Sequence, residues 1–258
     1  MSRRRALAAA AGVTAAASLV STGVLAGPAA AATRPPATPL SPVSPSSTAP
    51  NSEELKEALR RLKARRRRVL TGRPSANGWE MQKVVDADGD IGTLAVPGTG
   101  LTVTARHGDV GTVLVHVIRR FHYEVDALGL PGEPSPVEGW AKPSTVRDAR
   151  LPESNRASGT AVVIRPGSYP PGARGGFDAG QLLVLRDILA DTEGAVRWGG
   201  DDRRPYEGLF SLAVPPGDPR LARVAEKLRA WDTTPGLGAG VVVDVAEASR
   251  LRRAARYR

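Results

Sequence analysis

The sequence has no cysteine and only three histidines among its 258 residues. Without cysteine, the chain has no disulfide, no thiolate metal site, no cysteine nucleophile and no lipid attached through sulfur. Aromatic residues make up 4% of the chain, too few for the base-stacking surfaces of proteins that bind single-stranded nucleic acid. The glycine patterns of dinucleotide-binding and phosphate-binding loops are also missing. These absences exclude several common kinds of catalytic and nucleotide-binding site.

Positive charge is abundant, and it is concentrated towards the two ends of the chain. The formal net charge is +10, yet residues 71–249 alone carry a net charge of −4. The excess of basic residues lies at 1–32, at 53–72 and at 250–258. We therefore predict no nucleic-acid partner. The basic segments either attract an anionic polymer of the cell envelope or anionic lipid headgroups, or form a solvated basic face and a frayed tail.

The first 32 residues have the layout of a secretory signal peptide. Arg3, Arg4 and Arg5 precede an alanine-rich, weakly apolar stretch, which ends in the small-residue cleavage pattern of Ala30 to Ala32. We predict a secreted or envelope-located protein with no transmembrane segment after cleavage. Export through the general secretory route and export through the twin-arginine route both fit, and an uncleaved anchor is the alternative. Residues 33–52 contain six prolines and predict an extended linker.

Residues 53–72 predict a basic helix, followed by a folded domain at 73–249 and a basic tail at 250–258. Asn51 is expected to cap the helix, and Gly72 to end it. Four apolar residues share one face of this helix: Leu55, Leu59, Leu62 and Val69.

Within the folded domain, patterns typical of helices alternate with patterns typical of strands. Helices are predicted to begin at the caps Asp109, Asp178 and Asp218. Strands are predicted at 160–164, 195–198, 210–214 and 240–245. We predict an α+β fold with a small, mainly antiparallel sheet and flanking helices.

Six segments of this domain occur in the order and spacing of one known family. They are FHYE (121–124), GW (139–140), SNRASGTAVVI (154–164), GARGGFDAGQLLVLRDIL (172–189), VRWGGD (196–201) and RPYEGLFSL (204–212). In these segments residues 75–215 resemble the VanY-like D-alanyl-D-alanine carboxypeptidases. These are zinc enzymes of the hedgehog/DD-peptidase fold, which trim the stem peptides of peptidoglycan. The resemblance implies that fold for this chain.

The resemblance also implies a zinc site, but the residues that would form it are replaced. The family binds zinc through S-x-H-x-x-G-x-A-x-D and through the histidine of a D/E-x-x-H motif, whose acid is the general base. Ser154, Gly159 and Ala161 match the first motif, and Phe210 matches the residue after the second. The ligand and base positions are instead Arg156, Val163, Leu209 and Tyr206. These side chains bind no zinc and supply no base near neutral pH, so we predict no metal and no cofactor.

The histidines of the chain do not replace the missing ligands. His107, His116 and His122 all precede the first motif, and positions 116 and 122 do not share a helix face. We interpret them as ordinary hydrogen-bonded or surface histidines. Glu207 is close to the former base position but stands two residues from Leu209 rather than three.

A ligand-binding cleft is predicted to remain where the zinc site was. Its expected residues are Ser154, Arg156, Ser158, Trp198 and Asp201. Arg156 either binds a peptide carboxylate or pairs with Asp201 or Asp202. We therefore predict an exported, non-catalytic carboxypeptidase-like protein that binds peptidoglycan stem peptide or an envelope partner. The alternatives are an active zinc carboxypeptidase with relocated ligands and a structural interaction module without a peptide ligand.

Overall fold

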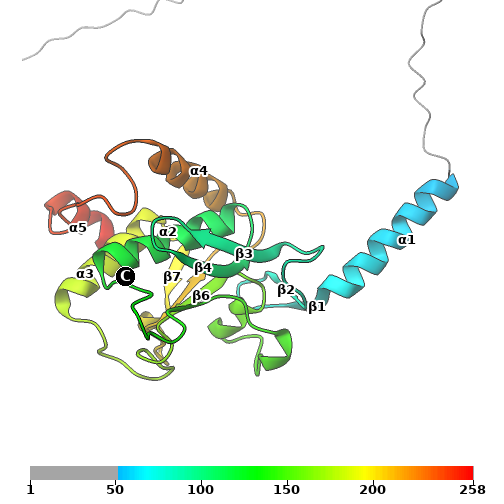
Figure 1. Cartoon of the computed structure of the whole chain (residues 1–258), viewed down its shortest axis with the longest axis horizontal. Coiled ribbons are helices and arrows are strands. Elements are labelled where there is room, and N and C mark those ends of the chain that lie inside the picture. The colour runs from blue at the N-terminus through cyan, green and yellow to red at the C-terminus, as the bar shows by residue number, and fades with distance from the viewer. Residues whose placement is uncertain (1–51, 258) are drawn as a thin grey trace, which may run out of the picture. The chain divides into compact units, whose positions relative to one another are not determined.

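The computed structural model describes residues 52–257. The predicted signal peptide, almost all of the predicted linker and the predicted cap Asn51 lie outside this range. The helices are α1 (Ser52–Val69), α2 (Asp109–Glu124), α3 (Ala179–Asp191), α4 (Pro219–Thr233) and α5 (Ala248–Ala254), together with the short 3-10 helices η1 (Pro143–Thr145), η2 (Pro152–Arg156), η3 (Gly199–Asp201) and η4 (Ala255–Tyr257). Figure 1 shows α2, α3, α4 and α5 gathered with the strands, whereas α1 extends away from them.

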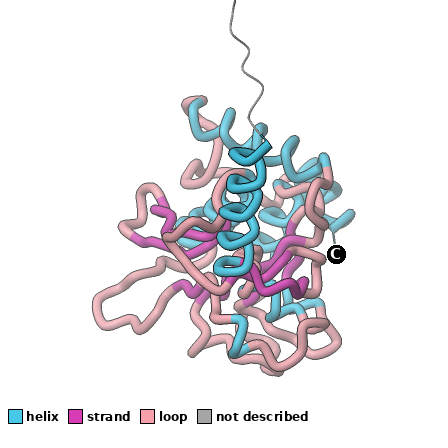
Figure 2. The backbone as a smooth tube through the Cα atoms, turned by 90° about the vertical axis from the view of Figure 1, so that its right-hand side faces the viewer, coloured by secondary structure: helices cyan, strands magenta, loops and turns pink. Residues whose placement is uncertain are grey.

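The strands form three antiparallel sheets. The largest has the order β5 (Val137–Glu138), β6 (Ala161–Ile164), β8 (Leu209–Leu212), β7 (Val196–Trp198). Two hairpins complete the set: β1 (Leu70–Pro74) with β2 (Glu80–Gln82), and β3 (Ile91–Val96) with β4 (Leu101–Arg106). All the strands are short and long loops join them (Figure 2). The predicted α+β class with small antiparallel sheets is confirmed.

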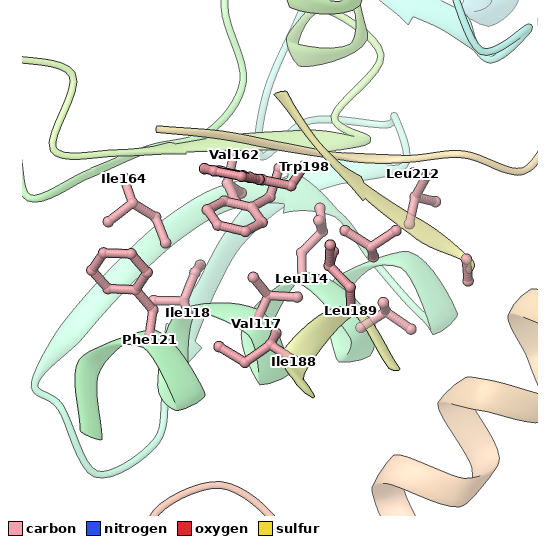
Figure 3. Packing of buried hydrophobic residues seen from close by; sticks show 14 of the residues in the cluster. Leu114, Val117, Ile118, Phe121, Val162, Ile164, Ile188, Leu189, Trp198 and Leu212 are labelled. Carbon is pink, nitrogen blue, oxygen red and sulfur yellow. The ribbon is translucent and has the colours of Figure 1, made fainter. Parts of the chain in front are cut away.

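The core lies between the four-stranded sheet and helices α2 and α3. Figure 3 shows side chains from the sheet facing the helices. The strands contribute Val162, Ile164, Trp198 and Leu212; α2 contributes Leu114, Val117, Ile118 and Phe121; α3 contributes Ile188 and Leu189. Each is almost fully buried, and full burial of an aliphatic or aromatic side chain contributes about 1.5–3 kcal/mol. Because β6 and β8 carry this core on one face, they are fixed firmly enough to hold a site on the other.

Two of the three predicted helix caps are confirmed. Asp178 accepts a hydrogen bond from the Gln181 backbone at 2.8 Å, and the Gln181 side chain accepts one from the Asp178 backbone at 3.0 Å, which completes a capping box. Asp218 likewise accepts from the Arg220 backbone at the start of α4. The prediction for Asp109 is wrong, because Gly108 is the cap residue and the Asp109 carboxylate pairs with Arg229 instead.

The strand predicted at 240–245 is also wrong. Gly236, Gly238 and Gly240 all have φ between 80° and 90°, a left-handed conformation that does not continue into a regular strand. Val242 is 100% exposed, so this apolar run does not pack against the sheet.

The predicted basic tail forms part of the folded body. Helix α5 packs on α3, where Arg250 donates to Asp187 at 3.1 Å and Arg253 donates to Asp191 at 2.9 Å. Arg120, only 2% exposed, also donates to Asp187 at 2.9 Å and to Asp191 at 2.6 Å. We call these five residues the charge cluster. Because two tail arginines neutralise buried acids, the expectation of a frayed tail is not met.

The charge cluster predicts a loss of stability in acid. Burial by itself raises the pKa of Asp191, but His116, whose Nε2 lies 3.6 Å from Oδ2, and the charges of Arg120 and Arg253 lower it to about 2. The ionised carboxylate therefore stabilises the fold above its ordinary pKa near 4, and this contribution disappears as the pH falls towards 2. We expect about 2 kcal/mol of unfolding free energy to be lost across that range. Urea unfolding at several pH values measures this loss. In the Asp191→Asn variant the free energy of unfolding should depend less on pH. An equally steep pH dependence in this variant would show that Asp191 is not the group responsible.

Candidate functional site

The four positions at which the resemblance expects zinc ligands and a base come together in the fold. Val163 on β6 and Leu209 on β8 face each other as paired residues of the antiparallel ladder. With Ala161 and Tyr206 they form a small buried cluster that is separate from the main core. Arg156 ends η2, close enough to Tyr206 for its charge to act on the tyrosine hydroxyl. Residues about 50 positions apart in the sequence thus lie close together.

The side chains at these positions do not fit a zinc ion. Val163 and Leu209 have no lone pair, and the Arg156 guanidinium does not deprotonate. Burial, together with the nearby carboxylates of Glu138 and Glu153, raises the pKa of Tyr206 against the opposing charge of Arg156, so the phenol is neutral at ordinary pH. Within residues 52–257 no three His, Cys, Asp or Glu side chains are grouped so as to hold a metal ion.

A cleft of about 300 Å³ opens beside this cluster. The segment of η1 and η2 supplies one wall, and Arg204 and Tyr206 supply the other. Three of the predicted positions line it: Ser154, Arg156 and Tyr206. The Ser154 hydroxyl donates to the Ala149 carbonyl at 2.9 Å and accepts from the Ala76 backbone at 2.9 Å. Ser154 therefore positions the wall of the cleft through its hydrogen bonds.

Arg156 is paired, but neither expected partner is correct. Its guanidinium donates to Glu138 at 2.8 Å and to the Gly139 carbonyl at 2.8 Å. Asp201 pairs with Arg186, and Asp202 pairs with Arg197. Glu138 belongs to β5, the neighbour of β6 in the sheet. This two-residue strand has no sequence pattern, so its carboxylate was not predicted at this place.

Ser158, Trp198 and Asp201 lie outside the lining of the cleft. Ser158 is fully buried and shares hydrogen bonds of 2.8 Å with Ser75 and Thr160. The Trp198 ring belongs to the main core, and its indole N–H donates to the Glu207 carbonyl at 2.6 Å. These residues support the walls and do not face a ligand.

Glu207 has a structural role close to the cleft. Its buried carboxylate accepts hydrogen bonds of 2.8 Å from the backbone N–H groups of Gly175 and Gly176. The loop that includes Pro171, another lining residue, is thereby tied to the start of β8. Both carboxylate oxygens of Glu207 are thus engaged by backbone donors.

Two arginines of the cleft were not predicted from the sequence. Arg147 and Arg204 line it, are exposed, and have no ion pair within residues 52–257. The lining carboxylates are Asp148, which pairs with Arg150, and Glu153. Because Arg156 is matched by Glu138 and Asp148 by Arg150, the remaining charges leave the cleft positive. Arg204 could have been predicted to lie near the cleft, because it stands two residues before Tyr206, one of the four positions named from the resemblance. Arg147 lies in an irregular loop without any motif.

The three histidines are remote from this cleft. His122 accepts a hydrogen bond at Nδ1 from the Leu128 backbone at 2.9 Å, His116 is buried near Asp191, and His107 is exposed just before α2. None lines the cleft.

Comparisons with known proteins give no match. No family model, no curated protein and no solved structure is similar to this chain. In the described range, 52–257, no helix is both long and apolar enough to cross a membrane.

Proposed function

We propose that this chain is an exported, non-catalytic member of the hedgehog/DD-peptidase fold that binds the carboxylate end of a peptidoglycan stem peptide in its cleft. The support is the positive cleft beside the convergent motif positions: Arg147 and Arg204 have no ion pair among the described residues. Guanidinium groups bind carboxylates through paired, charge-assisted hydrogen bonds. A volume of about 300 Å³ is at the small end for ligand sites and suits the last two residues of a peptide.

The cleft offers recognition but lacks catalytic groups. Tyr206 is a neutral phenol, Glu207 is engaged by Gly175 and Gly176, and Arg156 is held by Glu138. Val163 and Leu209, at positions where the resemblance expects zinc ligands, are apolar residues packed in the buried cluster beside the cleft. Binding without cleavage is the outcome that this arrangement supports best.

The arginines predict a specific loss of affinity. Arg147→Ala and Arg204→Ala are each expected to weaken binding of N-acetyl-L-Lys-D-Ala-D-Ala by about tenfold or more, because each removes a charged hydrogen-bond donor. Isothermal titration of the full chain measures this. The same peptide with a C-terminal amide should bind as weakly as the variants do.

Arg203→Ala is the matched control, since Arg203 is exposed next to Arg204 but does not line the cleft. It should leave the affinity unchanged. Absence of peptide binding by the unaltered chain would overturn the proposal and favour the structural interaction module. Stoichiometric zinc together with release of D-alanine would instead establish an active enzyme.

A further inference from the structure

Helix α1 presents a largely exposed apolar stripe. Leu55, Leu59 and Leu62 are 52%, 45% and 57% exposed. Their spacing of four and three residues continues through Arg66 to the buried Val69. This is the narrow 3.5-residue repeat of a coiled-coil seam, with Arg66 as a single charged residue within it. The proposed peptide cleft does not use this stripe.

The charged residues that flank the seam are all basic. Lys56 and Lys63 border it on one side, and Ala58 and Arg65 border it on the other. Glu53 pairs with Lys56, and Glu57 pairs with Arg60 and Arg61. A partner that lies along the stripe therefore meets the leucines between Lys63 on one side and Arg65 on the other.

The body of the protein holds this helix in place at its C-terminal half. Arg65 donates to the Asp88 carbonyl at 2.8 Å, Lys83 donates to the Arg67 carbonyl at 2.8 Å, and Arg68 pairs with the Asp88 carboxylate. Between the helix and residues 88–90 lies a groove of about 430 Å³ whose apolar floor is Leu59, Leu62, Val69 and Leu70. Figure 1 shows α1 leading directly into β1 of the β1–β2 hairpin.

We propose that α1 and this groove dock an amphipathic helix of a partner protein that carries apolar seam residues between acidic flanks. Charge complementarity selects this occupant, because a second copy would place Arg66 against Arg66 in a parallel pair and Lys56 against Lys63 in an antiparallel pair. An anionic polymer would bind the basic residues of α1 alone, so it would not account for the three exposed leucines. The apolar stripe is wide enough for one partner helix, and it is narrower than the apolar face of a helix that lies on a membrane.

A synthetic peptide of three heptads, with Leu at its seam and Glu at its flanks, tests the proposal on the full chain. We expect fluorescence anisotropy to show binding at least about tenfold tighter than for the same peptide with Lys at its flanks. Leu59→Ala combined with Leu62→Ala should weaken binding of the Glu peptide by about tenfold or more, since both leucines lose their buried contacts. Ala64→Gln, on the opposite face of the helix, should leave it unchanged.

Several results would overturn the proposal. Equal binding of the two peptides would do so, as would unchanged affinity of the Glu peptide for the double leucine variant when that variant has unaltered circular dichroism. A stable dimer of the chain in sedimentation equilibrium would point to a second copy as the occupant. Leucine-dependent binding to phosphatidylglycerol vesicles, without binding of the Glu peptide, would point to a membrane surface. None of these results depends on the peptide cleft, so the docking surface and the proposed function are tested separately.

Discussion

Placing the zinc ligands and base of the carboxypeptidases that the sequence resembles at four positions is expected to create a zinc site, in a part of the described chain that has no metal-binding cluster. The variant carries Arg156→His, Val163→Asp, Tyr206→Asp and Leu209→His. Val163 and Leu209 are paired across β6 and β8, and Tyr206 packs in the same cluster. Two histidines and a carboxylate brought to one point give a catalytic type of zinc site, with one position left for water. Equilibrium dialysis and metal analysis should find about one zinc per chain.

The same variant should depend on the metal for its stability. Without zinc, the new aspartate at the fully buried position 163 is an unpaired charge and lowers the free energy of unfolding by several kcal/mol. Added zinc should restore a large part of this loss, because it binds only the folded form. A threefold variant that keeps Leu209 is the control, and zinc should stabilise it much less. A folded fourfold variant without zinc affinity would contradict the correspondence between the motifs and these positions.

Replacing Arg120 by methionine is expected to lower the free energy of unfolding by about 3–5 kcal/mol. The guanidinium is buried among Asp187, Asp191 and Glu124. Its removal leaves carboxylates without their central partner in a place that water does not reach, whereas the hydrocarbon of methionine keeps most of the packing. Urea unfolding followed by circular dichroism gives the difference.

Arg119→Met is the matched control, one residue earlier on the same helix. Arg119 pairs with Asp232, whose side chain is 39% exposed, so solvent screens the pair and its removal should cost about 0–1 kcal/mol. Equal losses of unfolding free energy in the two variants would show that the charge cluster stabilises the fold no more than an exposed ion pair does.

Local sequence signals predicted most of the helices, and tertiary contacts decided the rest. Asp178 and Asp218 act through backbone groups within three residues, so their capping roles are readable from the sequence. The run at 240–245 has the composition of a strand, but no neighbouring strand accepts it and the glycines before it turn the chain away. The β3–β4 hairpin was missed although Gly98 and Gly100 mark its turn.

The same distinction holds for the site. Val163, Tyr206 and Leu209 lie in one buried cluster, and only the resemblance to a family, not any local pattern, had linked these distant positions. The partner of Arg156 was not predictable, since Glu138 reaches it only through the pairing of β5 with β6. Arg147 contributes to the cleft from an irregular loop, where neither periodicity nor capping gives a signal.

The charge cluster also has a consequence for the order of folding. Arg120 meets Asp191 across 71 residues of sequence, and Asp187 meets Arg250 across a further 63. Closing such long loops is slow and has an entropic cost that local contacts do not have. The cluster is therefore expected to form after the main folding barrier, so that weakening it accelerates unfolding far more than it slows refolding. The last helix of the described chain then sets how long the folded state survives rather than how quickly it is reached.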